Sequence, residues 1–213
     1  MSDIFREIDE DLRREHYAKL WQRFGKHLIA AAVVVVIATA LFVAWREYQG
    51  RQRQAEGLRY AAALDLARQG KDKDALDAFA AMAASTSDGR GVLARFEEAA
   101  LRTKTGDRDG ALAIYDQIAK TGSLEDTYRD LANLLAARLL VDKAPKDAAQ
   151  RLLPLTDAKN PWHATALELT AIADLKDGNK TEARATYQRI ADDLGAPQGV
   201  RARAAEMVAA LGQ

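Results

Sequence analysis

Three histidines, His16, His27 and His163, are the side chains of this 213-residue sequence best suited to metal binding. None has a second histidine at ligand spacing, and the sequence contains no cysteine, so neither a metal site nor a disulfide is expected. The run DRDG at 107–110 has the beginning of a calcium loop, but it lacks the acidic residue that closes an EF-hand. The run is more typical of a turn between two helices.

Catalytic patterns are also missing. The sequence has no glycine-rich phosphate loop, nucleophile elbow or paired-acid motif, and acidic pairs such as Glu97-Glu98 are typical of solvated helix faces. We therefore predict no catalytic residue, no cofactor, no small-molecule substrate and no enzymatic activity. The 31 basic and 31 acidic residues balance, so no basic surface for nucleic acid is predicted.

The segment from Leu28 to Trp45 contains eighteen residues without a charge. As a helix it is roughly 27 Å long, close to the roughly 30 Å hydrocarbon core of a bilayer. Ten of its residues are Leu, Ile, Val or Phe, which favour membrane insertion. A buried core helix or a buried strand over 33–37 are the alternatives, but length and the flanking alanines favour a transmembrane helix at 28–45.

The tail at 1–27 is highly charged, with apolar residues recurring every three to five positions. These residues are Ile4, Phe5, Ile8, Leu12, Tyr17, Leu20, Trp21 and Phe24. The spacing predicts an amphipathic helix that lies in the membrane interface, contacts a partner, or is a solvated extension of the span. Because the tail carries six acidic residues, it is unlike the basic start of a cleaved signal peptide, and we expect an uncleaved signal-anchor.

The rest of the sequence repeats itself. The strings GKDKDALDAFAAMA, GDRDGALAIYDQIA and GNKTEARATYQRIA begin at Gly70, Gly106 and Gly178, and the degenerate DKAPKDAAQRLLPL begins at Asp142, which gives four marks spaced by 36 residues. Each glycine suits the left-handed conformation that ends a helix. The alanine five residues later suits a close helix crossing, so Ala111 is predicted to lie at one. The sequence thus predicts an internal helical repeat.

Partner helices precede each mark, roughly at 58–69, 92–105, 128–141 and 163–177, and a last helix at about 198–211 covers the end of the stack. Helix starts are predicted at Ser123-x-x-Asp126, which resembles a capping box, and at Asn160-Pro161. The third repeat aligns if one residue is inserted, and Pro145 and Pro154 mark it as irregular. A connector at 46–57, with bends at Gly50 and Gly57, then joins the span to a repeat domain at 58–213.

Two resemblances follow from these residues. The glycine, small alanine and aromatic of each repeat resemble the tetratricopeptide repeat. The string KLWQRFGKHL, the Ala/Val-rich span and WREYQ resemble the bacterial inner-membrane proteins that form the ancillary subunit family of the Sec translocon. The fold expected is all-α, with an N-terminal amphipathic helix and a single transmembrane helix before an α-solenoid of tetratricopeptide-like hairpins.

The resemblance implies a function in protein binding. It implies an N-terminus in the cytoplasm, a repeat domain in the periplasm, and association with a SecYEG-type translocon and with periplasmic chaperones or prolyl isomerases. The alternatives are a cytoplasm-facing adaptor of another membrane complex and an enzyme with an unrecognised site. Candidate residues of a partner-binding groove are Phe96, Lys104, Arg129 and Glu168.

Overall fold

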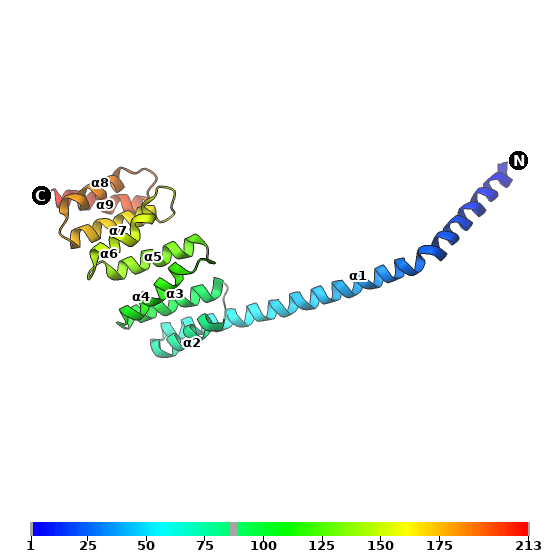
Figure 1. The fold of residues 1–213 in the computed structure, drawn as a ribbon, viewed down its shortest axis with the longest axis horizontal. Helices are drawn as coiled ribbons and strands as arrows, with labels where there is room; N and C mark the ends of the chain where they lie inside the picture. The colour runs from blue at the N-terminus through cyan, green and yellow to red at the C-terminus, as the bar shows by residue number, and fades with distance from the viewer. Residues whose placement is uncertain (1, 86–88, 213) are drawn as a thin grey trace. The chain divides into compact units, whose positions relative to one another are not determined.

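The computed structural model describes the backbone of residues 2–85 and 89–212, and the side chains of residues 26, 29–85 and 91–212. Every regular element in this part of the chain is helical (Figure 1). The elements are α1 (Ser2–Arg68), α2 (Asp72–Ser85), α3 (Gly89–Lys104), α4 (Arg108–Lys120), α5 (Asp126–Leu140), α6 (Pro145–Leu152), the 3₁₀ helix η1 (Leu153–Thr156), α7 (His163–Lys176), α8 (Lys180–Asp192) and α9 (Gln198–Leu211). The all-α prediction is confirmed.

The chain divides into two compact units, 1–58 and 59–213. The first consists of most of α1, and the second holds the end of α1 and all later helices. The chain stays helical through Gly50 and Gly57, so the predicted bends do not interrupt α1. The amphipathic face predicted for the tail lies outside the described side chains.

The segment predicted to span a membrane forms part of α1 and is long and apolar enough to do so. Its large side chains lie open: Val33 exposes 51% of its surface and Leu41 exposes 66%. None of this apolar stretch is buried against the described protein. The alternative of a buried core helix is therefore wrong, and so is the strand over 33–37.

The turns of the repeat domain follow from its glycines. Gly70, Gly106 and Gly178 have φ angles of 74°, 91° and 88°, the left-handed conformation predicted for them. The residue after the glycine donates its N–H to the carbonyl five positions back in two of these turns, as in a Schellman motif: Lys71 to Leu66 at 3.0 Å, and Asn179 to Asp174 at 2.8 Å. Each helix thus ends where the glycine stands.

The third repeat is irregular, as predicted. Three residues separate the helices at each glycine turn, whereas four separate α5 from α6, and Asp142 does not adopt a positive φ. Pro145 occupies the first turn of α6, where the missing N–H costs nothing. Pro154 lies where α6 has already given way to η1, because proline cannot donate the α-helical hydrogen bond.

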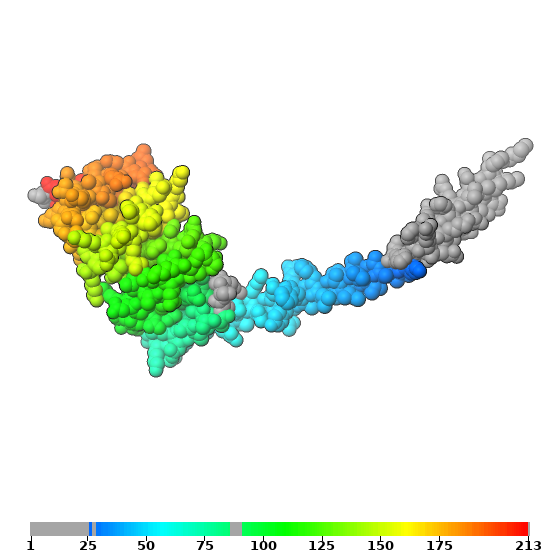
Figure 2. Space-filling view, viewed as in Figure 1, coloured from blue at the N-terminus to red at the C-terminus, as the bar shows by residue number. Residues whose placement is uncertain are grey.

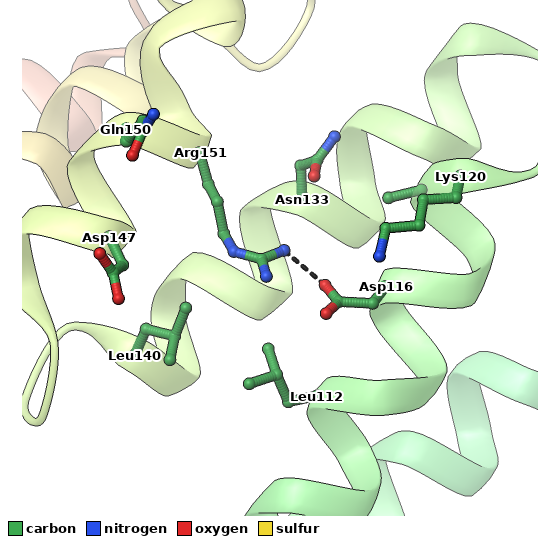
Figure 3. A pocket seen from close by; sticks show the side chains of 9 residues that line it. Leu112, Asp116, Lys120, Asn133, Leu140, Asp147, Gln150 and Arg151 are labelled. Carbon is green, nitrogen blue, oxygen red and sulfur yellow. Dashed lines mark hydrogen bonds and ion pairs between the residues drawn. The ribbon is translucent and has the colours of Figure 1, made fainter.

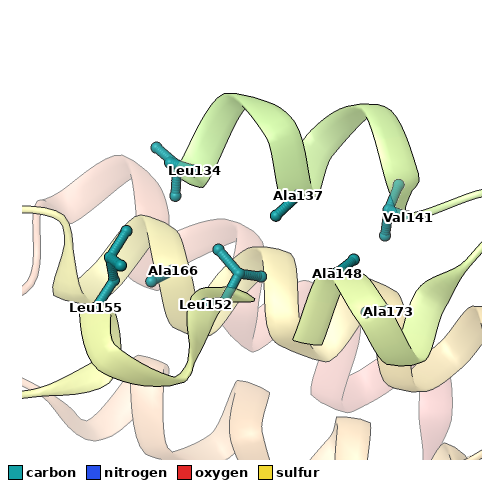
Figure 4. Packing of buried hydrophobic residues seen from close by; sticks show 8 residues of the cluster. All are labelled: Leu134, Ala137, Val141, Ala148, Leu152, Leu155, Ala166 and Ala173. Atoms are coloured by element: carbon teal, nitrogen blue, oxygen red, sulfur yellow. The ribbon is translucent and has the colours of Figure 1, made fainter. Parts of the chain in front are cut away.

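Each core cluster of the repeat domain joins consecutive helices. In Figure 4, Leu134 and Ala137 of α5 face Ala148 and Leu152 of α6, while Ala166 lies behind them on α7. Similar clusters join α1 to α3, α3 to α5 and α7 to α9. The repeat alanines Ala75, Ala111, Ala148 and Ala183 all expose 0% of their surface. Helices that bury apolar faces only against neighbours form a solenoid.

The end of α1 enters this domain as its first helix. Ala63 is 1% exposed, and the ring centroids of Tyr60 and Phe79 lie 5.6 Å apart in an edge-on contact. The Tyr60 hydroxyl donates a hydrogen bond of 3.0 Å to Glu97 on α3. Burial, followed by this contact with Glu97, raises the pKa of Tyr60 to about 12. The last turns of α1 are therefore fixed to α2 and α3.

The caps predicted for two helices are wrong, although α7 begins at His163 as its predicted range does. Helix α5 begins at Asp126 after Glu125, and no side chain caps it, so Ser123 does not form a capping box. Helix α7 begins at His163 after Trp162. Asn160 instead accepts a hydrogen bond of 2.8 Å from the Trp162 N–H, which makes a turn before the helix.

Candidate partner-binding grooves

The four residues predicted to line a groove all lie on the helices that precede the repeat marks: Phe96 and Lys104 on α3, Arg129 on α5 and Glu168 on α7. None of them lines either of the two grooves described below. Each makes a contact within its own repeat or with a neighbouring one. Their role in partner binding stays a prediction.

Phe96 is half-buried and packs against the cluster that joins α3, α4 and α5. Its ring centroid lies 6.1 Å from that of Tyr115 in a tilted arrangement. Part of the Phe96 side chain therefore contributes to the core. Only the remaining face is open to a partner.

The other three candidates are charged and paired. The Lys104 ammonium donates to Asp72 at 2.7 Å, and Glu168 accepts two bonds from Arg203 of α9, at 2.8 and 2.9 Å. Arg129 is bonded to Asp126 one turn earlier, and its buried Nε has no hydrogen-bond partner. A partner that used these side chains would have to share or displace these bonds.

One groove lies between α4, α5 and α6, and we call it the α4–α6 groove (Figure 3). Its volume is about 600 Å³. The guanidinium of Arg151 reaches across it and donates to Asp116 at 2.5 Å, while Leu112 and Leu140 approach it from opposite helices. An ion pair crosses the middle of this groove, which reduces the space that it offers to a ligand.

A second groove, the α3–α7 groove, has a volume of about 550 Å³. Its lining residues come from four helices: Ala100, Thr103, Arg108, Tyr115, Leu135, Arg138, Leu139, Val141, Asp142, Leu169 and Ile172. Apolar side chains thus form much of its surface, with three charged residues among them. A groove of this size holds a few side chains rather than a whole domain.

The three charged residues of the α3–α7 groove differ in whether they are bonded to another side chain. Asp142 is held by the Lys176 ammonium at 2.8 Å, and this hydrogen bond lowers the pKa of the Asp142 carboxyl. Arg108 and Arg138 are exposed, and neither guanidinium makes a side-chain hydrogen bond or salt bridge in the described part of the chain, although the charge of Arg108 also lowers the pKa of Asp142. The prediction from sequence missed both arginines. The signal was present, because Arg108 stands two residues after its repeat glycine, where the first repeat has Asp72.

Metal ligands do not gather in the described domain. Residues 29–85 and 91–212 contain no group of three or more His, Asp or Glu side chains that could hold a metal ion. The Nδ1 of His163 lies 2.7 Å from the Thr156 carbonyl oxygen, so this ring nitrogen donates to the backbone and joins α7 to η1. The run 107–110 is the start of α4 rather than the whole interhelical turn: Asp107 is the N-cap, and its carboxylate accepts from the Gly110 N–H in the first helical turn at 3.0 Å.

Stacked helix pairs with open grooves and left-handed glycine turns define a class of protein, the α-solenoids that bind other proteins. Residues 18–208 match the family model described as a tetratricopeptide repeat-like domain. Because the match covers most of the sequence, the chain belongs to this family. Tetratricopeptide-like repeats are typically non-enzymatic interaction scaffolds.

Solved structures show the same fold. Two crystal structures of the nearly identical TPR-like repeats of a putative kinesin light chain from Podosopora anserina, one of them a point variant, superpose with TM-scores of 0.58 and 0.57. Each is 14% identical in sequence; they cover 72% of this chain, and the matched parts are 82% and 83% of those chains. A search of curated proteins finds no match. At this identity the likeness concerns the fold alone.

Proposed function

We propose that this protein is a membrane-anchored scaffold, held by α1 and binding protein partners through the grooves of its repeat domain. The observation that carries the proposal is the open apolar stretch of α1, in the same chain as a tetratricopeptide-like array. Exposure of this surface to water is unfavourable, because the free energy rises by about 25 cal/mol for each Å² of apolar surface exposed. A bilayer removes that cost.

The ends of the apolar stretch support a membrane position. Trp45 exposes 62% and Tyr48 57% of their surfaces, as expected of aromatic side chains at a membrane interface. Lys26 and Arg46 flank the stretch and have stems long enough to reach the headgroups. We expect the full-length protein to stay with the membrane after carbonate or high-salt washing, because apolar burial does not depend on ionic strength. Release by either wash would contradict the anchor.

The side of the membrane is the second part of the proposal. The fifteen residues before the span carry five basic residues and the fifteen after Trp45 carry four, a weak bias for a cytoplasmic N-terminus. The resemblance to the ancillary Sec-translocon subunits supports the same orientation, with the repeat domain in the periplasm. There the domain would contact a SecYEG-type channel and the chaperones or prolyl isomerases that receive emerging chains.

Protease protection tests the orientation. Protease added to intact spheroplasts should degrade the repeat domain while a cytoplasmic marker survives. If the domain survives until lysis, and the unfolded control is cut readily, the protein is a cytoplasm-facing adaptor instead. The charge bias of one residue is small enough that this second function is a real alternative.

Crosslinking in intact membranes tests the partners. A photoreactive amino acid at exposed Leu93 of α3 should capture translocon or chaperone subunits. The same group at exposed Leu194, in the α8–α9 turn, tests a second position on the domain. Capture from neither position, with the protein intact in the membrane, would contradict a scaffold for these partners.

A further inference from the structure

Two walls of the α4–α6 groove carry the same charge pattern. On α4, Asp116 is followed four residues later by Lys120, and on α6, Asp147 is followed four residues later by Arg151. Residues four apart lie on one face of a helix, so each wall presents an acid and then a base. The equivalent helices α2 and α8 have no acidic residue followed four positions later by a basic one. The pattern therefore belongs to this groove and not to the repeat.

These four charges have a definite order across the groove. Arg151 and Asp116 are bonded to each other in its middle, and Figure 3 shows Asp147 and Lys120 on opposite sides of this pair. Asp147 and Lys120 are exposed, and neither makes a salt bridge or side-chain hydrogen bond in the described part of the chain. The groove thus has a negative charge on one side, an ion pair in the middle and a positive charge on the other side.

This order of charges is complementary to itself. A two-fold axis that passes through the Arg151–Asp116 pair, perpendicular to the surface, reverses the order. Asp147 of one copy then lies over Lys120 of the other, and the same contact forms again on the opposite side, as in any isologous interface. In the middle, the two ion pairs lie antiparallel, so each guanidinium faces a carboxylate of the other copy. Opposite charges meet at every position.

We propose that the α4–α6 groove is the contact surface of a dimer of this chain, in which Lys120 of each copy pairs with Asp147 of the other. Leu112, Ala119 and Leu140 line the same groove, and a second copy removes them from water. Two acidic and two basic residues line the groove, so its net charge favours neither an acidic nor a basic partner. The self-complementary order favours a second copy instead.

A dimer of this kind leaves the other groove for further partners. Helix α4 contributes to both grooves, but no residue lines both. The dimer would therefore carry two α3–α7 grooves, and a partner that reaches both would bind more tightly than one that reaches a single groove. The inference goes beyond the proposed scaffold function and does not depend on which partners the scaffold binds.

Energy transfer between full-length copies in neutral phosphatidylcholine vesicles tests the dimer. The sequence has no cysteine, so Leu194→Cys, in the exposed α8–α9 turn, gives a single labelling site outside the groove. Copies labelled with donor and acceptor dyes should show energy transfer. The transfer should fall when an excess of unlabelled chain is added, because unlabelled copies replace labelled ones in the dimer.

Charge reversal tests the contact itself. Lys120→Glu should weaken association by about tenfold or more, because the dimer then contains two contacts between like charges. Asp147→Lys should do the same. An equimolar mixture of the two variants should regain the energy transfer of the parent. In the mixed dimer, the introduced glutamate faces the introduced lysine, and the two native residues still pair.

Arg189→Glu is the matched control. It makes the same charge change as Lys120→Glu at an exposed residue of α8 outside the groove, and association should stay within about twofold of the parent. Should Asp147→Lys lose its helical circular dichroism spectrum, the result with Lys120→Glu decides alone.

Three results would overturn the dimer: no energy transfer between parent copies, transfer unchanged by Lys120→Glu, or no recovery in the mixture of two folded variants. Unchanged transfer would mean that the copies associate through another surface, such as the apolar stretch of α1. If parent copies stay apart while a photoreactive group at exposed Gln150 captures a different protein, the groove binds that protein instead. The scaffold function stands in each case, because it rests on membrane washing and on crosslinking at Leu93 and Leu194.

Discussion

Glycine at the three repeat turns acts through its backbone. Gly70, Gly106 and Gly178 all have φ between 74° and 91°, and a Cβ at any of them would meet no atom within 4 Å. Sterics with neighbouring side chains therefore do not explain the choice of glycine. The left-handed backbone does, because a side chain there crowds its own carbonyl oxygen.

Gly106→Ala tests this cost. We expect the change to lower the free energy of unfolding by about 1–2 kcal/mol, because alanine must adopt the left-handed conformation. Gly199→Ala in α9 is the control, since its backbone has no positive φ and a Cβ would make ordinary contact with Arg203 at 3.7 Å. Urea unfolding followed by circular dichroism measures both. Equal losses would show that the φ angle of Gly106 is unimportant.

Asp107 makes stability depend on pH. The hydrogen bond from Arg102, followed by that from the Gly110 N–H, lowers the pKa of the Asp107 carboxyl below its ordinary value of 3.8. A lowered folded-state pKa stabilises the protein above the ordinary value, and this contribution is lost as pH falls through the folded-state pKa. Asp107→Asn should therefore lose stability at neutral pH and lose less than the parent on acidification below about pH 4.

Urea midpoints at pH 7 and pH 3 for parent and variant measure this difference. Asp109→Asn, in the same first turn but without a side-chain hydrogen bond in the described part of the chain, should change the acid dependence less. Parallel pH profiles for the Asp107 variant and the parent would contradict the role of the Arg102 bond.

At the scale of the element, the repeat alanines decide how closely helices pack. Ala111 is 0% exposed and belongs to the cluster of α3, α4 and α5. Ala113, two residues along the same helix, is exposed. The two alanines thus have the same backbone and opposite surroundings.

We expect Ala111→Leu to cost about 1–3 kcal/mol of stability, because the close crossing has no room for three more carbons. Ala113→Leu should stay within about 0.5 kcal/mol of the parent, since its side chain points to solvent. Thermal unfolding of the two variants makes the comparison. A stable Ala111 variant would show that the helices can move apart at little cost.

The helices were predictable because the same motif recurs every 36 residues and its small and apolar residues have helical spacing within each copy. The 36-residue spacing located the turns at Gly70, Gly106 and Gly178, and it exposed the irregular third repeat. The caps at Ser123 and Asn160 were not predictable, because a capping side chain has other partners to bind: the Asn160 side-chain oxygen accepts from the Trp162 N–H at 2.8 Å, and its amide donates to Asp130 on α5 at 2.7 Å. The α3–α7 groove was missed because it needs residues from four helices whose rotation the sequence does not specify.

For the whole molecule, the division into two units predicts that the repeat domain folds without the N-terminal part of α1. Residues 59–213 form a compact unit with its own core clusters, whereas residues 2–58 belong to α1 alone. Figure 2 shows the described helices of the 59–213 unit packed closely together. Deleting residues 1–48 should leave a helical domain that needs no detergent, because the open apolar stretch is removed and the end of α1 is kept. Circular dichroism and gel filtration measure the result. A strand-rich or aggregated product would contradict an independent domain.

The packing of each helix on its immediate successors also shapes how the chain acquires its structure. Contacts between residues close in sequence form fast, because little loop entropy is lost in making them. The first helix pair has its partners as soon as α3 is made, and each later pair adds to an existing surface. The array can therefore fold hairpin by hairpin as the chain is synthesised, without waiting for its C-terminus.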